Sequence, residues 1–176
     1  MLLVLSDLSS KDQIPKHLNP EVIFLLGDFK PRRIVHLIDF HFKCPKFGVT
    51  GNHDKDDLYL DTNIINISRE LHSWNGKSIG GISGVPRYNS KPYGQFDESE
   101  VASYLGNLPP NLDYFLAHTN PLIDEQTDNA HRGSESLSEY IHMKKPKHLF
   151  HGHLHEPKEY VIGDTLVHSV YLANQY

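Results

Sequence analysis

Residues 47–54 read Phe-Gly-Val-Thr-Gly-Asn-His-Asp, so a short apolar run leads directly into three different polar side chains. A short run of this kind, bounded by glycine and polar residues, favours a buried strand over a helix. Gly51 allows the turn after the strand to approach other backbone closely, because it has no Cβ. We therefore expect a strand that ends in a turn presenting Asn52, His53 and Asp54.

Four more apolar runs end in the same way. They end at Asp7, at Gly27-Asp28, at His118 and at Gly152-His153-Leu154-His155, after runs at 2–6, 22–26, 112–117 and 148–151. In open α/β sheets, sites form beyond the carboxyl ends of the strands. We therefore expect these polar side chains to meet at one edge, and an extended backbone would place His153 and His155 on one face of the chain.

The rest of the pattern indicates an α/β sandwich in one domain over residues 1–176, since 176 residues is a usual length for one domain. Alternating strands and helices come first, and mainly strands follow. Helical or mixed stretches are expected at 11–19, 31–40, 97–106 and 134–143. Further strands are expected at 77–83, 158–162 and 165–171, the last two forming a hairpin around Gly163-Asp164.

The composition excludes several classes of protein. Cys44 is the single cysteine, so a disulfide framework or a cysteine-rich zinc cluster is excluded, although 13 histidines are present. A net charge of −5 gives no field for general nucleic-acid binding. The N-terminal residues 2–5 are apolar, but no basic segment precedes them and Asp7 follows. They are too short for a signal peptide or a membrane span, so we expect a cytoplasmic protein without membrane partners.

Taken in order, the blocks Asp…Gly-Asp…Gly-Asn-His-Asp…His…Gly-His-x-His resemble the signature of the calcineurin-like metallophosphoesterases. The resemblance runs from Asp7 to His155 and is greatest to the compact single-domain phosphodiesterase branch. It implies a four-layer α-β-β-α sandwich of two mixed sheets flanked by helices. The protein Ser/Thr phosphatases are less similar, because residues 29–32 here read Phe-Lys-Pro-Arg after the Gly-Asp pair.

The same resemblance implies a dinuclear metal site and a role for each matching residue. Asp28 would bridge two divalent cations, with Asp7 and His155 on metal one and with Asn52, His118 and His153 on metal two. A metal-bridging hydroxide would attack the phosphorus, and His53 would act as general acid with Asp54 orienting it. Mixed N/O ligation without thiolate suits Mn²⁺, our first expectation, and also Fe, Co, Ni or Zn.

The chain departs from the family pattern at Ser9, where a histidine ligand of metal one is usual. Three interpretations stay open. Ser9 ligates weakly or through water, metal one is loosely held, or the site is mononuclear and the protein degenerate. Arg87, Tyr88 and Arg132 lie in polar segments near the motifs, where contact with substrate phosphate competes with an ordinary solvated loop.

The leading functional hypothesis is a metal-dependent phosphoesterase, above all a phosphodiesterase acting on a small or nucleotide-like phosphate ester. One alternative is a catalytically silent interaction scaffold on the same fold, and a second is a nuclease acting on short or single-stranded ends. Neither the substrate nor the oligomeric state follows from the sequence, because specificity depends on loop shape.

Overall fold

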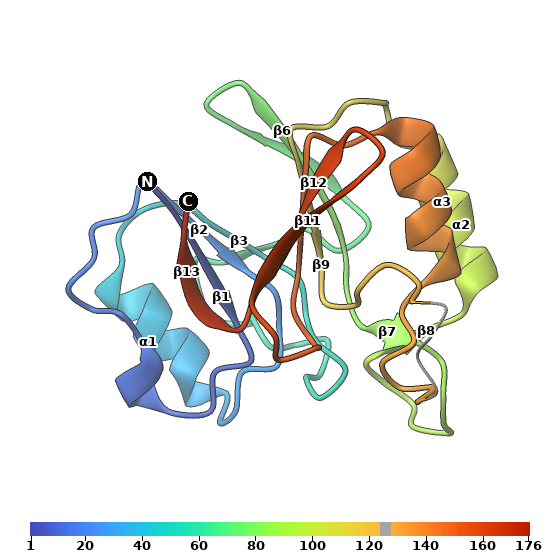
Figure 1. The fold of residues 1–176 in the computed structure, drawn as a ribbon. Helices are drawn as coiled ribbons and strands as arrows, with labels where there is room; N and C mark the ends of the chain where they lie inside the picture. Colours follow the sequence, from blue (N-terminus) through green and yellow to red (C-terminus); the bar gives the residue numbers. More distant parts are fainter. Residues whose placement is uncertain (124–127) are drawn as a thin grey trace.

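The computed structural model of the protein describes residues 1–123 and 128–176, and two β-sheets packed face to face form its centre (Figure 1). The first sheet has the strand order β13-β1-β2-β3-β4 and the second β11-β12-β10-β9-β6-β5. The first comprises β1 (Leu2–Ser6), β2 (Val22–Leu25), β3 (Lys46–Gly48), β4 (Ile65–Asn66) and β13 (Leu172–Gln175). The second comprises β5 (Leu71–Trp74), β6 (Lys77–Ile82), β9 (Tyr114–Ala117), β10 (His148–His151), β11 (Lys158–Ile162) and β12 (Thr165–Ser169). A small parallel pair, β7 (Val85–Pro86) and β8 (Gln95–Phe96), stands apart from both.

Helices cover the outer face of each sheet, which completes the four layers. Helix α1 (Arg33–His41) packs on the first sheet, and α2 (Glu98–Asn107) and α3 (Glu135–Lys144) pack on the second (Figure 1). Alternate residues of β1 divide between the two layers, since Leu3 and Leu5 pack with α1 and Val4 packs between the sheets. This period of two is the expected behaviour of a strand buried on both faces. The predicted α-β-β-α sandwich is confirmed.

Parallel pairing brings the strand ends together. Strands β1, β2 and β3 are mutually parallel, and so are β6, β9, β10 and β12. Past the end of β1, the backbone N–H of Asp7 donates to the carbonyl of Gly27 at 3.0 Å, which fixes these two loops against each other. The hairpin of β11 and β12 forms as predicted, with Ile162 opposite Thr165.

The helical or mixed stretch expected over 11–19 is mostly irregular. Only a single 3-10 turn, η1 (Lys11–Gln13), forms there, capped by Ser10 and Gln13, whose side chains bond each other's backbone N–H groups. Pro15 and Pro20 remove two backbone donors and end any longer helix. Strand β13 was not predicted, because its sequence Leu-Ala-Asn-Gln lacks an apolar pattern. Its extended backbone is held by antiparallel pairing with β1. In the described ranges, no helix has the length and apolar character needed to cross a bilayer.

Candidate metal centre

Three side chains from the two sheets meet where their strands end. Asp7 follows β1, Asp28 follows β2 and His118 follows β9, and one ligand atom from each lies within 4.8 Å of the others. The distance from Oδ2 of Asp28 to Nε2 of His118 is 3.7 Å. Two carboxylates and an imidazole this close form a group able to hold a divalent cation.

The ring of His118 is fully buried, and its hydrogen bonds indicate what its free nitrogen faces. Nδ1 lies 2.7 Å from the carbonyl oxygen of Leu26, which can only accept, so Nδ1 carries the proton of the neutral ring. Nε2 then presents a lone pair to Oδ1 of Asn52 at 3.0 Å and to Oδ2 of Asp28 at 3.7 Å. A cation among these acceptors would remove their mutual repulsion, so the donor set fits a metal.

The pKa values of His118 and Asp28 also indicate a site that favours a cation. Burial by itself would lower the pKa of His118, but the carboxylates of Asp28 and Asp7 outweigh it and raise the pKa. Burial by itself would raise the pKa of Asp28, but His118 and the backbone N–H of His53 hold it below its ordinary value. The pocket of Asp28 and His118 therefore favours positive charge beside a carboxylate.

Asn52 is held on both its backbone and its side chain by the loop between β7 and β8. Nδ2 of Asn52 donates to the hydroxyl of Tyr88 at 3.3 Å, and Nζ of Lys91 donates to the Asn52 carbonyl oxygen at 2.5 Å. Gln95 fixes this loop by accepting from the N–H groups of Tyr88 and Asn89 and by donating to the carbonyl of Lys91. These contacts direct Oδ1 of Asn52 towards His118. Sequence reasoning missed Lys91 and Gln95, because no local motif marks them.

The Gly-His-x-His segment contacts Asp7 and lies beside His118, since the ring centroids of His118 and His153 are 5.0 Å apart. Nε2 of His155 lies 3.1 Å from Oδ1 of Asp7, and the backbone N–H of His153 donates to Oδ2 of Asp7 at 3.2 Å. The ring of His153 is buried, and its Nε2 bonds the carbonyl of Ala130 at 2.7 Å, which leaves Nδ1 for a cation. Burial lowers the pKa of His153 to about 3, so the ring is neutral and able to ligate.

The backbone of the site is unusual. Asp7, Asp28, His153 and His155 all have positive φ, at 58°, 58°, 70° and 54°. The expectation of an extended Gly-His-x-His segment is therefore wrong, because both histidines adopt the left-handed conformation that residues with a Cβ rarely take. Each such residue costs on the order of 1–3 kcal/mol and persists only where the surroundings impose it. Four of the ten positive-φ residues with a Cβ in the described ranges thus belong to the predicted metal ligands.

His53 and Asp54 have different surroundings. The backbone N–H of His53 donates to Oδ1 of Asp28 at 2.8 Å, while its side chain is 49% exposed with Nε2 at 3.9 Å from Oδ2 of Asp28. Both oxygens of Asp54 accept from backbone N–H groups, those of Gly51, Asp28 and Phe29. Asp54 thus ties the loop after β3 to the loop after β2. Among the described residues, the hydrogen-bond partners of the Asp54 carboxylate are these backbone N–H groups and not the His53 ring.

Ser9 lies at the edge of this arrangement. It is exposed, and its backbone N–H donates to Oε1 of Gln13 at 2.7 Å. The segment therefore serves to start η1. The three interpretations of the missing histidine stay open.

Cavities flank the centre on two sides. One of about 330 Å³ is lined by His53 with Lys30, Arg32 and Lys55. Another, of about 340 Å³, is lined by Arg87, Tyr88 and Arg132, the three residues singled out from the sequence. Part of the loop between His118 and Arg132 lies outside the described residues. Both cavities offer guanidinium or ammonium groups, which suit anionic substrates.

Comparison with known proteins establishes the fold. No protein-family profile matches the sequence, and the search of curated proteins returns no match. Solved structures do match over nearly the whole chain. TT1561 of Thermus thermophilus is 17% identical with a TM-score of 0.70, covering 96% of this chain and 87% of its own. Phosphopantetheinyl hydrolase (PptH) of Mycobacterium tuberculosis is 16% identical with a TM-score of 0.71, covering 97% and 89%.

A variant of Vps29 from Entamoeba histolytica is more distant, at 13% identity and a TM-score of 0.51, covering 96% of this chain and 72% of its own. At such identities the likeness concerns the fold. The chain has the fold of the calcineurin-like metallophosphoesterases, as its motifs predicted.

Proposed function

We propose that the protein is a metal-dependent phosphoesterase, and in particular a phosphodiesterase for small or nucleotide-like phosphate esters. The observation that carries the proposal is the group of Asp7, Asp28 and the fully buried His118, which follow three different strands and offer ligand atoms within 4.8 Å of one another. Two carboxylates and an imidazole in this arrangement suit a divalent cation.

The residues present would hold two cations. Asp28 would be shared between them, with Asp7 and His155 on one cation and Asn52, His118 and His153 on the other; the support is that Asp7, Asp28 and His118 lie within 4.8 Å of one another and that His155 and Asn52 contact Asp7 and His118. When bound, divalent cations, with Mn²⁺ as our first choice, would neutralise phosphoryl charge and lower the pKa of a water nucleophile. Tyr88 and Lys91 would keep Asn52 in place, and Ala130 would keep the ring of His153 in place.

His53 is the residue best placed to give a proton to the leaving group. Its ring is half-exposed at the opening of the site and lines a cavity with Lys30, Arg32 and Lys55. Burial lowers the pKa of His53, an effect that Asp28 opposes. A lower pKa makes the protonated ring a stronger acid, although it reduces the protonated fraction at neutral pH. The three cations would hold the anionic ester next to it.

Hydrolysis of bis(p-nitrophenyl) phosphate with added Mn²⁺ tests the proposal. Activity should disappear with EDTA, return with Mn²⁺ and be lost in Asp28→Asn, while Asp164→Asn, an exposed residue paired with Lys145, should retain it. A chain that binds Mn²⁺ without hydrolysing any of a panel of cyclic nucleotides, dinucleotides, lipid headgroups and monoesters would favour the scaffold. Turnover confined to single-stranded DNA or RNA ends would favour the nuclease.

A further inference from the structure

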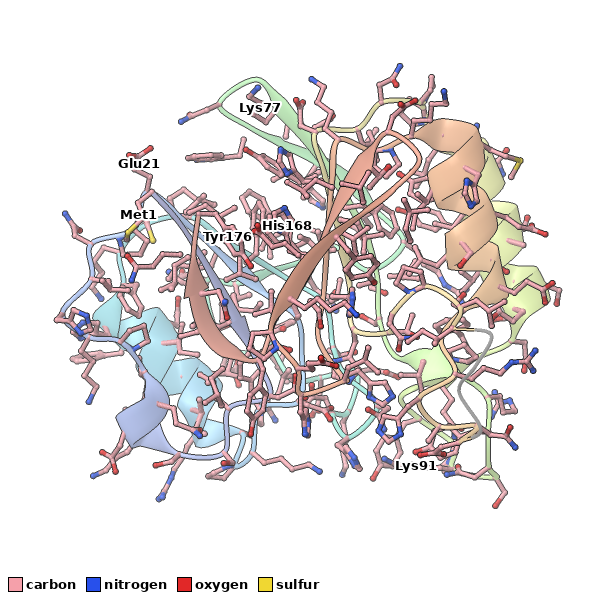
Figure 2. All side chains as sticks on the ribbon, in the orientation of Figure 1. Met1, Glu21, Lys77, Lys91, His168 and Tyr176 are labelled. Atoms are coloured by element: carbon pink, nitrogen blue, oxygen red, sulfur yellow. The ribbon has the colours of Figure 1, made fainter. Side chains whose placement is uncertain are left out.

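A third cavity lies between the two sheets near the amino ends of β9 and β10, and none of the candidate metal ligands lines it. Its volume is about 360 Å³. Rings form most of its wall, namely Trp74, Tyr114, His148, Phe150, His168 and Tyr176. Figure 2 labels His168 and Tyr176 on this side of the molecule and Lys91, from the loop that holds Asn52, on the opposite side. The cavity is thus separate from the proposed active site.

Two histidines occupy the inner face of the second sheet at this point. In the register of the strands, His148 lies opposite Tyr114, and Phe150 lies opposite His168. Elsewhere the layer between the sheets is apolar, with Leu116 among its residues. Polar side chains in such a layer are costly unless they are hydrogen-bonded, and departures from an apolar pattern concentrate at functional positions. The two imidazoles therefore call for a functional account.

Their hydrogen bonds form a directed chain. Nδ1 of His168 donates to Oε1 of Glu159 at 2.8 Å, because a carboxylate can only accept. Nε2 of His168 then accepts from Nδ1 of His148 at 3.1 Å, since burial lowers the pKa of both rings and favours their neutral forms. Nε2 of His148 is left with a lone pair. On this wall of the cavity, Nε2 of His148 is thus a hydrogen-bond acceptor.

We propose that this cavity binds a planar nitrogen heterocycle of the nucleobase class, which packs against the ring walls and donates an N–H to Nε2 of His148. Flat aromatic walls favour a flat aromatic ligand, because rings stack or meet edge to face. The volume lies within the range of small-molecule pockets, roughly 300–1,000 Å³. The acceptor nitrogen selects a ligand that carries an N–H. Glu21 also lines the cavity, and its carboxylate is paired with the ammonium of Met1 at 3.0 Å, so neither charge is free to select a charged ligand.

Adenine is the probe, and Trp74 is the reporter, because it is the one tryptophan of the chain and it lines the cavity. Excitation at about 295 nm, where adenine does not absorb, should give a saturable fluorescence change with a dissociation constant of about 1 mM or tighter. His148→Phe keeps a ring but removes the acceptor and should weaken binding about tenfold. Asp28→Asn, at the metal centre, should leave adenine binding unchanged.

A control ligand and a second variant complete the experiment. Cyclohexanecarboxamide, which carries N–H groups but no flat ring, should give no saturable change. Trp74→Leu removes one wall at a partly exposed strand end and should weaken adenine binding measured by saturation-transfer NMR, a readout that does not need the tryptophan. His148→Phe and Trp74→Leu are both checked for an unchanged melting temperature, and either one, if folded, suffices for the test.

Three results would overturn the proposal. One is the absence of any saturable response to adenine, and another is adenine binding that is lost in Asp28→Asn but kept in His148→Phe, which would place adenine at the metal centre. The third is a dimer, seen by sedimentation, that Trp74→Leu dissociates, because the cavity would then accommodate a second copy of the chain. None of these results depends on phosphoesterase activity.

Discussion

The hydroxyl of Tyr88 lies 3.3 Å from Nδ2 of Asn52, and this contact orients the opposite end of the amide, Oδ1, to 3.0 Å from Nε2 of His118. An amide can present either end to a cation, and only its oxygen can ligate. Tyr88 therefore selects the useful orientation of a candidate metal ligand from a loop 36 residues further along the chain.

Tyr88→Phe removes this hydrogen bond and leaves the ring in place. We expect the Mn²⁺ concentration for half-maximal activity to rise about tenfold, because partners behind a metal ligand typically contribute that much. Tyr93→Phe, in the same loop and in contact with Lys91 through its ring, is the matched control and should have no effect. Equal metal requirements in the two variants would show that Tyr88 does not orient Asn52.

His53→Ala should separate substrates by their leaving groups. Hydrolysis of an alkyl ester, whose leaving oxygen needs a proton, should fall about 100-fold or more, whereas a p-nitrophenyl ester should be affected far less. Metal content, measured on the purified variant, should be unchanged, because the ring of His53 is half-exposed and its nearest approach to Asp28 is 3.9 Å. A uniform loss on both esters would assign His53 to binding.

The two proposed metal sites should differ in affinity. Ser9 stands where the family pattern has a histidine, is exposed and offers only a neutral hydroxyl, so we expect the cation beside Asp7 and His155 to be held less tightly. Calorimetric titration with Mn²⁺ should show one tighter site and a second about tenfold weaker or more, with activity rising beyond one equivalent. Tight binding of two equivalents without any difference in affinity would contradict this.

Gly51→Ala should abolish metal binding. A Cβ at position 51 would come within 2.6 Å of the backbone nitrogen of Asp28 and within 2.7 Å of its Cγ, so the carboxylate would have to move. Gly106→Ala is the matched control, because a Cβ there meets nothing within 4 Å and lies in α2. The control should be stabilised by about 0.5–1 kcal/mol. Mn²⁺ affinity measured for both variants decides the point.

Acid should lower the free energy of unfolding, partly because Asp113 becomes protonated. The ammonium of Lys147 and the backbone N–H of Ser78 hold the pKa of this carboxyl well below its ordinary value. A depressed pKa contributes stability that is complete above the unfolded-state pKa, about 3.9, and is lost as the pH falls towards the folded-state pKa. The free energy of unfolding should therefore drop less steeply below about pH 4 in Asp113→Asn than in the wild type. The exposed Asp56→Asn controls for net charge, and parallel curves would refute the assignment.

Much of the site follows from local pattern. Asp7, Asp28 and His118 each follow an apolar run, and runs of that length in an alternating chain form parallel strands whose carboxyl ends share an edge. That rule brings Asp7 and Asp28 together within one sheet, whereas the approach of His118 from the second sheet depends on how the two sheets pack. The helical or mixed stretch expected at 11–19 forms only one 3-10 turn for a local reason, since Pro15 removes a backbone donor.

Other features have no local cause. Lys91 and Gln95 hold Asn52 through contacts across a loop, and the positive φ of His153 and His155 is imposed by Asp7 and Ala130. The spacing of apolar residues indicates which face of a strand or helix is buried. It does not indicate which loop lies over that face.

The amino-acid sequence by itself determined the α/β class of this protein, most of its strands and the identity of the residues that gather at their ends. Hydrophobic period and chain direction suffice for that, because they act over a few neighbouring residues. The tertiary structure alone decided how Asn52 is oriented, what Asp54 holds and that Trp74 and His148 share a cavity. These depend on contacts between segments far apart in the chain, whose distances no local pattern contains.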